Sequence, residues 1–175
     1  MLENILIGVT SSLVASGIFL LFLYRLRPQI EISPFIAKES RPNGKIEYGF
    51  KFVNRTPYPL IDIKAKVRLR VAEVAPGGSS GAGLIWDSKR IAAGEIWQVA
   101  AYDPNDKNYD YAQRMTRDVD LEAEWDDSKV SELIFEVMAR HSLSGFSIVA
   151  SRKWVKKNGS IVVGTHNYGA DLGVS

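Results

Sequence analysis

The chain of 175 residues contains no cysteine and only two histidines, and both shortages narrow its chemistry. Without a thiol there is no disulfide, no zinc–thiolate site and no cysteine nucleophile. A serine triad or a metal site would depend on His141 and His166, and neither has a second histidine or a carboxylate at helical spacing. We therefore predict a protein that is not an enzyme and that holds no metal or cofactor.

Two classes of anion-binding protein are also disfavoured. The glycine-rich stretch from Ala75 to Gly83 lacks the Gly-Lys-Ser or Gly-Lys-Thr ending of a phosphate-binding loop, so we interpret it as a flexible surface loop. The net charge is only +2, whereas a dedicated duplex-binding domain is strongly basic. The sequence therefore predicts no partner of the duplex nucleic acid class.

Charge is absent from the start of the chain, because Ile5 to Tyr24 contains no Asp, Glu, Lys or Arg. About 20 apolar residues match a hydrocarbon core about 30 Å thick, whereas the apolar region of a signal peptide is shorter. No Lys or Arg precedes this span, while Arg25 and Arg27 follow it, and such cations stay in the cytoplasm. We predict a single-pass anchor, residues 1–27, in the inner membrane with the N-terminus outside and the remaining domain cytoplasmic.

Small residues recur within this span at Gly8, Ser12 and Ser16, four positions apart. Such residues on one helical face let two backbones approach closely, which is the usual basis of helix association in lipid. The simpler interpretation is that small residues are common in spans. We favour self-association and expect a homo-oligomer.

Beyond Pro28 the apolar residues alternate with polar ones, which is typical of half-buried strands. The clearest case is Ile61 to Val71, and Ile30 to Ile32 and Ile46 to Phe52 precede it. Further strands are expected at 84–86, 96–102, 119–125, 133–137, 146–150 and 161–163, with a polar loop at 103–117. This series without an amphipathic helix predicts an all-β immunoglobulin-like β-sandwich over residues 28–166, followed by a loose C-terminal tail, 167–175.

Two segments resemble a known family. They are FKFVNRTPYPLIDIKAKVRL from Phe50 to Leu69, and DLEAE from Asp120 to Glu124 running on to FEVMARHS, Phe135 to Ser142. Both look like the cytoplasmic immunoglobulin-like domain of bacterial inward-rectifier potassium channels, whose Val-Asn-like turn and Ala-Arg-x-hydroxyl ending are matched by Val53-Asn54 and by Ala139, Arg140 and Ser142. The chain lacks the second span, the pore helix and the Thr-Val-Gly-Tyr-Gly filter, so that type of potassium selectivity is excluded. The resemblance implies a fold, a place under the membrane and self-association.

Two charged rows repeat at every second residue, so each is expected on one side of a strand. The basic row comprises Lys64, Lys66, Arg68 and Arg70, and the acidic row comprises Asp118, Asp120, Glu122 and Glu124. In one interpretation they form cross-strand pairs or face water, contributing about 0.2 to 1 kcal/mol per pair. In the other, the basic row contacts an anionic ligand such as a lipid headgroup or a nucleotide.

These features predict a single-pass membrane protein whose cytoplasmic sandwich senses a ligand or partner and whose helix self-associates, in the manner of an effector that perturbs the membrane. The alternative is a non-enzymatic adaptor or structural module tethered to the bilayer. A hydrolase with an unrecognised site is the third hypothesis.

Overall fold

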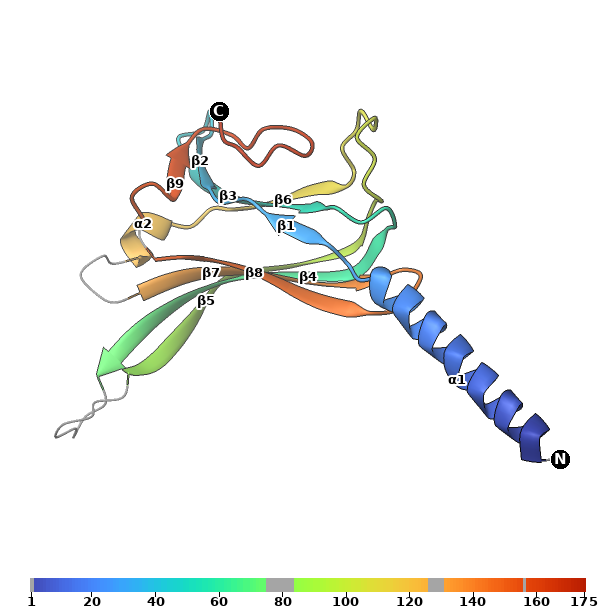
Figure 1. Ribbon diagram of the computed structural model, residues 1–175. Helices are drawn as coiled ribbons and strands as arrows, with labels where there is room; N and C mark the ends of the chain where they lie inside the picture. The colour runs from blue at the N-terminus through green and yellow to red at the C-terminus, as the bar shows by residue number, and fades with distance from the viewer. Residues whose placement is uncertain (1, 75–83, 126–130, 156) are drawn as a thin grey trace.

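A computed structural model describes the chain except for residues 1, 75–83, 126–130 and 156. It consists of one N-terminal helix, α1 (Leu2–Arg25), and two facing β-sheets (Figure 1). The expected β-rich body preceded by an apolar helix is therefore confirmed. The glycine-rich loop expected at 75–83 lies outside the described residues.

Helix α1 projects away from the sheets, and its side chains from Leu6 to Tyr24 contact almost nothing else in the molecule (Figure 1). The segment Leu6–Arg25 is long and apolar enough to cross a membrane, by length and composition. Only at Leu26, which is 8% exposed, does the chain become buried against the sheets.

The first sheet is organised around β3 (Ile46–Asn54). Strands β1 (Ile30–Ile32) and β2 (Ile36–Ser40) lie end to end along one side of β3, and β6 (Ala112–Arg117) pairs with the other side. Strand β9 (Ile161–Val163) adds in parallel to β2. The break between β1 and β2 coincides with Pro34, which cannot donate a ladder hydrogen bond.

The second sheet is antiparallel throughout, in the order β5-β4-β7-β8. Its strands are β4 (Leu60–Val74), β5 (Leu84–Val99), β7 (Ser131–His141) and β8 (Ser147–Trp154). Alternation fixes the two faces of β4: Val67 is fully buried, whereas its neighbour Lys66 is exposed. A shift of one residue would bury the charged face, so the register is strongly specified.

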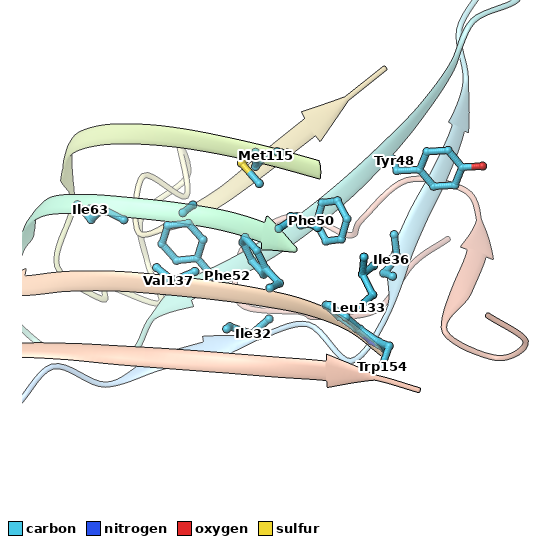
Figure 2. Packing of buried hydrophobic residues seen from close by; sticks show 14 of the residues in the cluster. Ile32, Ile36, Tyr48, Phe50, Phe52, Ile63, Met115, Leu133, Val137 and Trp154 are labelled. Atoms are coloured by element: carbon cyan, nitrogen blue, oxygen red, sulfur yellow. The ribbon is translucent and has the colours of Figure 1, made fainter. Parts of the chain in front are cut away.

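The core lies between the sheets and is rich in aromatic rings (Figure 2). Phe50 from the first sheet lies 5.4 Å from Phe135 of the second, centroid to centroid, and 6.1 Å from Trp154. The indole Nε1 of Trp154 donates to the Pro34 carbonyl oxygen at 2.6 Å, so its polar atom is satisfied inside the core. The two sheets therefore share one hydrophobic core.

Three sequence predictions about local structure are wrong. The alternation at 119–125 is not a strand, because it includes a short helix, α2 (Leu121–Glu124), which buries Leu121 and Trp125 and exposes Ala123. The Asp120 side chain caps this helix by accepting from the Ala123 amide at 3.0 Å. The strands expected at 84–86 and 96–102 belong to one strand, β5, ending at Val99, and the loop expected at 103–117 includes β6.

Candidate functional site

An open groove of about 660 Å³ lies on the second sheet, at the end where β4 begins and β7 finishes. It is lined by Asp62, Ile63, Lys64, Glu95, Ile96, Trp97, Met138, Ala139, Arg140 and Ser147. These residues come from all four strands of the sheet, so the groove depends on the register of the whole sheet.

A backbone irregularity in β4 accompanies the groove. The pairing of β4 with β7 shifts register between Ile61 and Lys64, and Asp62 adopts a left-handed φ of 52°. Asp tolerates this conformation better than most residues, and such bulges re-aim side chains. Here the Asp62 carboxylate accepts a hydrogen bond from the Arg140 guanidinium of β7.

The groove combines both signs of charge with exposed apolar surface. Besides the pair of Asp62 and Arg140, Lys64 lies 3.8 Å from Glu95, and both members of this pair are largely solvated. Trp97 is 78% exposed and Met138 is 39% exposed. A large exposed indole beside solvated ion pairs is characteristic of recognition surfaces.

The groove lies close to the C-terminal end of helix α1. Ser147 of the groove pairs with Arg140 at the start of β8, directly after the β7–β8 turn. Ser144 in that turn donates through its hydroxyl to the carbonyl oxygen of Leu26 at 3.2 Å. Because Ser144 and Ser147 are three residues apart, about 10 Å of extended chain at most separates the residue that contacts Leu26 from this side of the groove.

Much of the basic row is engaged by glutamates of β7. Arg68 donates to Glu136 at 2.5 Å, and Arg70 donates to Glu132 at 2.8 Å. Lys66 has no carboxylate within ion-pairing distance among the described residues, and Lys64 has only its 3.8 Å contact.

The acidic row does not face the basic row: in the α2 region, Glu122 pairs with Lys38 and Glu124 with Lys89. These contacts favour the cross-strand interpretation for the two arginines, and anion binding by the row stays a prediction.

The residues predicted to associate in the membrane lie free on α1. Ser12 and Ser16 are exposed, and a Cβ added at Gly8 would meet nothing within 4 Å. Association through this face stays a prediction.

The outer face of the first sheet is covered by the C-terminal segment, 164–175, which is not a loose tail. Lys51 of β3 is only 4% exposed, and its ammonium donates to the carbonyl oxygens of Asn167 and Asp171, the latter at 2.7 Å. Burial lowers the pKa of this lysine. The Ser33 hydroxyl, just after β1, donates to the Leu172 carbonyl oxygen, and the Arg55 guanidinium, just after β3, donates to the Ala170 carbonyl oxygen. The segment is therefore held at several points along the first sheet.

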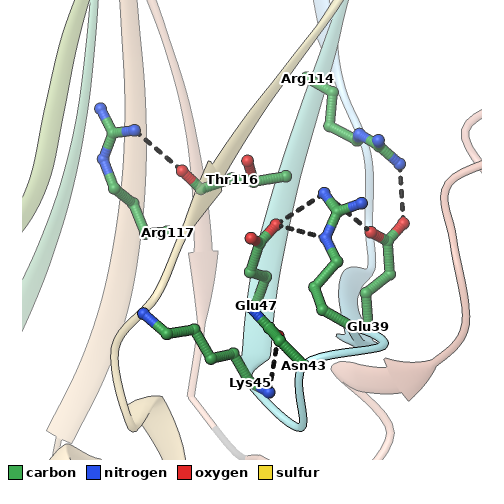
Figure 3. A network of polar contacts seen from close by, with 8 residues as sticks. Glu39, Asn43, Lys45, Glu47, Arg114, Thr116 and Arg117 are labelled. Carbon is green, nitrogen blue, oxygen red and sulfur yellow. Dashed lines mark hydrogen bonds and ion pairs between the residues drawn. The ribbon is translucent and has the colours of Figure 1, made fainter.

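Ion pairs occupy other outward positions on this sheet (Figure 3). Arg114 of β6 donates to Glu39 of β2 at 2.8 Å, and Arg41 donates through two nitrogens to Glu47. The first pair reaches across β3, which lies between β2 and β6, and the second pair joins the two sides of the β2–β3 turn. The charges of these four side chains are therefore paired within the protein.

Both histidines are buried in structural positions. The Nδ1 atom of His141 accepts from the amides of Leu143 and Ser144, and the His166 Nε2 atom lies 3.1 Å from the Gly49 carbonyl oxygen. Burial lowers the pKa of both rings. Among the described residues, no group of three or more His, Cys, Asp or Glu could hold a metal ion.

No family model matches the chain, and no curated protein matches it. Among solved structures, the sporulation control protein Spo0M of Bacillus subtilis is similar with a TM-score of 0.39 and 9% identity, over 79% of this chain and 50% of that one. The chain thus spans about half the length of Spo0M. The E. coli curli protein CsgC is similar with a TM-score of 0.26 and 12% identity, over 73% of this chain and 98% of that one. Neither is a potassium-channel domain, neither likeness is close enough to carry an argument, and the channel resemblance stays a prediction.

Proposed function

We propose that the chain is a membrane-anchored, non-enzymatic binding module. Helix α1 crosses the bilayer, the two-sheet domain lies on its cytoplasmic side, and the groove on the second sheet binds a ligand or a segment of a partner protein there. The observation that carries this proposal is the position of the groove, which exposes Trp97 and two solvated ion pairs beside the end of an apolar helix.

The charges of the groove define the class of ligand. Asp62 and Glu95 stand beside Arg140 and Lys64, so a purely anionic ligand would meet two carboxylates. A ligand with both a cationic and an anionic group next to an apolar one matches this surface better. A peptide segment meets that description, whereas a nucleotide does not.

The strand that carries Trp97 supports a peptide ligand. Strand β5 is an edge strand of its sheet, and an edge exposes backbone donors and acceptors to an added strand. One acceptor on this edge is already occupied, because the Arg117 guanidinium donates to the Ala93 carbonyl oxygen at 2.6 Å. The part of β5 beyond Ala93, toward Trp97, is the segment nearest the groove.

Two finer features belong to the same proposal. An immunoglobulin-type arrangement of the sheets would agree with the sequence resemblance, and association of α1 through Gly8, Ser12 and Ser16 would bring several grooves together at the membrane. In that assembly the module acts as a sensor or effector, and as a single anchored copy it acts as an adaptor.

Site-specific photo-crosslinking in intact membranes tests the binding proposal. A photoreactive residue replaces Val149, which is exposed and pairs with Met138 at the side of the groove. The matched control is Val163, which is exposed on the other sheet. We expect a discrete adduct at position 149 and none at position 163, and we expect Trp97→Ala to abolish it. An adduct that survives Trp97→Ala, or the same adducts at both positions, would contradict the proposed groove.

A further inference from the structure

The connection between helix and sheets is too short to let the domain move away from the bilayer. Only residues 26–29 separate α1 from β1, which is about 14 Å of extended chain. This linker is also fixed: Leu26 is buried, the Gln29 amide donates to the Thr56 hydroxyl at 2.9 Å, and the Arg55 amide donates to the Gln29 carbonyl oxygen at 2.8 Å. The end of the domain that carries the linker therefore stays at the membrane surface.

Two turns at this end gather around the helix exit (Figure 1). They are the β3–β4 turn, residues 55–59, and the β7–β8 turn, residues 142–146. The Ser142 amide donates to the Pro59 carbonyl oxygen at 3.2 Å, and Ser144 reaches Leu26 as described above. Buried Asn54 braces the first turn by donating to the Tyr58 carbonyl oxygen at 2.9 Å. Both turns are thus held rigidly beside the last residues of the span.

Three of the side chains that these turns expose are large and apolar or aromatic. Leu143 is 61% exposed, Phe146 is 39% exposed and Tyr58 is 36% exposed. Tyr58 packs edge-on against His141 at a centroid distance of 5.2 Å, so its orientation is set from within the domain. Exposed apolar residues grouped at one end of a domain mark a contact surface.

We propose that Leu143, Phe146 and Tyr58 form a second membrane contact, which enters the boundary between headgroups and acyl chains on the domain's side of the bilayer. The contact rests on the proposed function, because it requires α1 to span the membrane. A bilayer is the occupant because this apolar surface continues directly from the end of the span, where aromatic and basic residues are typical of the lipid–water boundary. Arg27 adds to that boundary by stacking over Tyr24, 3.8 Å from its ring centroid.

This contact fixes the tilt of the domain relative to the bilayer. A single helix with a short linker sets only the height of the domain, whereas a second attachment at the β7–β8 turn sets its tilt. Because the groove begins at Ser147, next to that turn, the contact holds the groove at one distance from the lipid surface.

Fluorescence quenching in vesicles tests the contact, and the absence of cysteine from the chain permits single labels without further changes. Full-length variants Leu13→Cys, Leu143→Cys and Val163→Cys each carry the same environment-sensitive fluorophore in phosphatidylcholine vesicles. Nitroxide lipids quench either at headgroup depth or deep in the acyl chains. We expect loss of most of the signal at position 13 with the deep quencher, at position 143 with the shallow one, and at position 163 with neither. Phe146→Asp should reduce the quenching at position 143.

The outcomes separate the two proposals. Quenching at position 13 together with equal, weak quenching at positions 143 and 163 overturns the second contact and leaves the anchor intact. No quenching at position 13 by the deep lipid overturns the anchor and the contact with it. Strong quenching at position 143 that Phe146→Asp does not change also overturns the contact, because the label itself then enters the lipid.

Discussion

The outer faces of the two sheets both carry many charges, but the described part of the chain covers the first face and leaves the second open. On the first sheet, Lys51 is buried beneath the C-terminal segment and donates to its carbonyl groups. On the second sheet, Lys66 is exposed, and among the described residues the ion-pair partner of Lys64 is Glu95, at 3.8 Å. Charge alone therefore does not identify a binding surface, because a charge that the protein itself satisfies contributes to stability and is not available to a ligand.

The largest expected effect tests which side chains of β4 face the core and which face solvent. Val67→Asp places an unpaired carboxylate in the shared core, at a cost of several kcal/mol against a typical stability of about 5 to 15 kcal/mol. We expect the full-length protein to lose its cooperative unfolding transition in mild detergent. Lys66→Asp, one residue away on the open face, should leave that transition in place. Equal damage from both changes would show that the face assignment is wrong.

The second prediction compares the two outer faces directly. Lys51→Met removes the buried ammonium and leaves the carbonyl oxygens of Asn167 and Asp171 without their donor, so we expect a loss of about 2 kcal/mol in the free energy of unfolding. Lys66→Met on the open face is the matched control and should change it by less than about 0.5 kcal/mol. Denaturant unfolding of the two variants gives both values. Similar losses would mean that the C-terminal segment is not held through Lys51.

Alternating patterns predicted the strands that carry the core, because alternation reports burial on one side. Strands β3, β4 and β7 were recognised in this way from residues such as Phe50, Val67 and Phe135. Strand β6 was missed because its sequence, AQRMTR, contributes only Met115 to the core. The α2 segment was misread because Leu121 and Trp125 satisfy a period of two as well as a helical spacing of four.

The covering of Lys51 and the groove could not be predicted locally. Lys51 meets carbonyl groups 116 and 120 residues further along the chain, and a lone lysine in a strand gives no sign of such partners. The groove requires the registers of four strands and the bulge at Asp62. The exposed Trp97 was the available signal, but the alternation Ile96-Trp97-Gln98 does not say which side is buried.

The third prediction concerns pH and the covered face. Burial lowers the pKa of His166, whose Nε2 must carry a proton because it faces the Gly49 carbonyl oxygen, so the folded ring stays neutral. Below the unfolded pKa of about 6.5, the unfolded chain takes up a proton that the folded chain resists, so stability falls as the pH falls toward the lowered folded pKa. The limiting slope for one such group is about 1.4 kcal/mol per pH unit.

Unfolding measured from pH 7 downward in the wild type and in His166→Gln checks this prediction. The variant should lose part of the acid destabilisation, while His141, whose pKa is lowered in the same direction, keeps the remainder. Identical pH profiles would show that His166 is accessible to protons in the folded state and that the C-terminal segment does not seal this face.

The smallest expected effect decides whether the arginines of the open face are structural. Arg68 and Glu136 are partly buried partners 2.5 Å apart, whereas Lys45 and Asp118, near the first sheet, are well solvated at 2.7 Å. Double-mutant cycles to alanine should give a coupling of about 0.5 to 1 kcal/mol for the first pair and about 0.2 kcal/mol or less for the second, because solvation and salt screen exposed pairs. A first coupling no larger than the second would mean that Glu136 does not hold Arg68. The Arg68 guanidinium would then be available to an anionic ligand, and the open face would extend from the groove as far as Arg68.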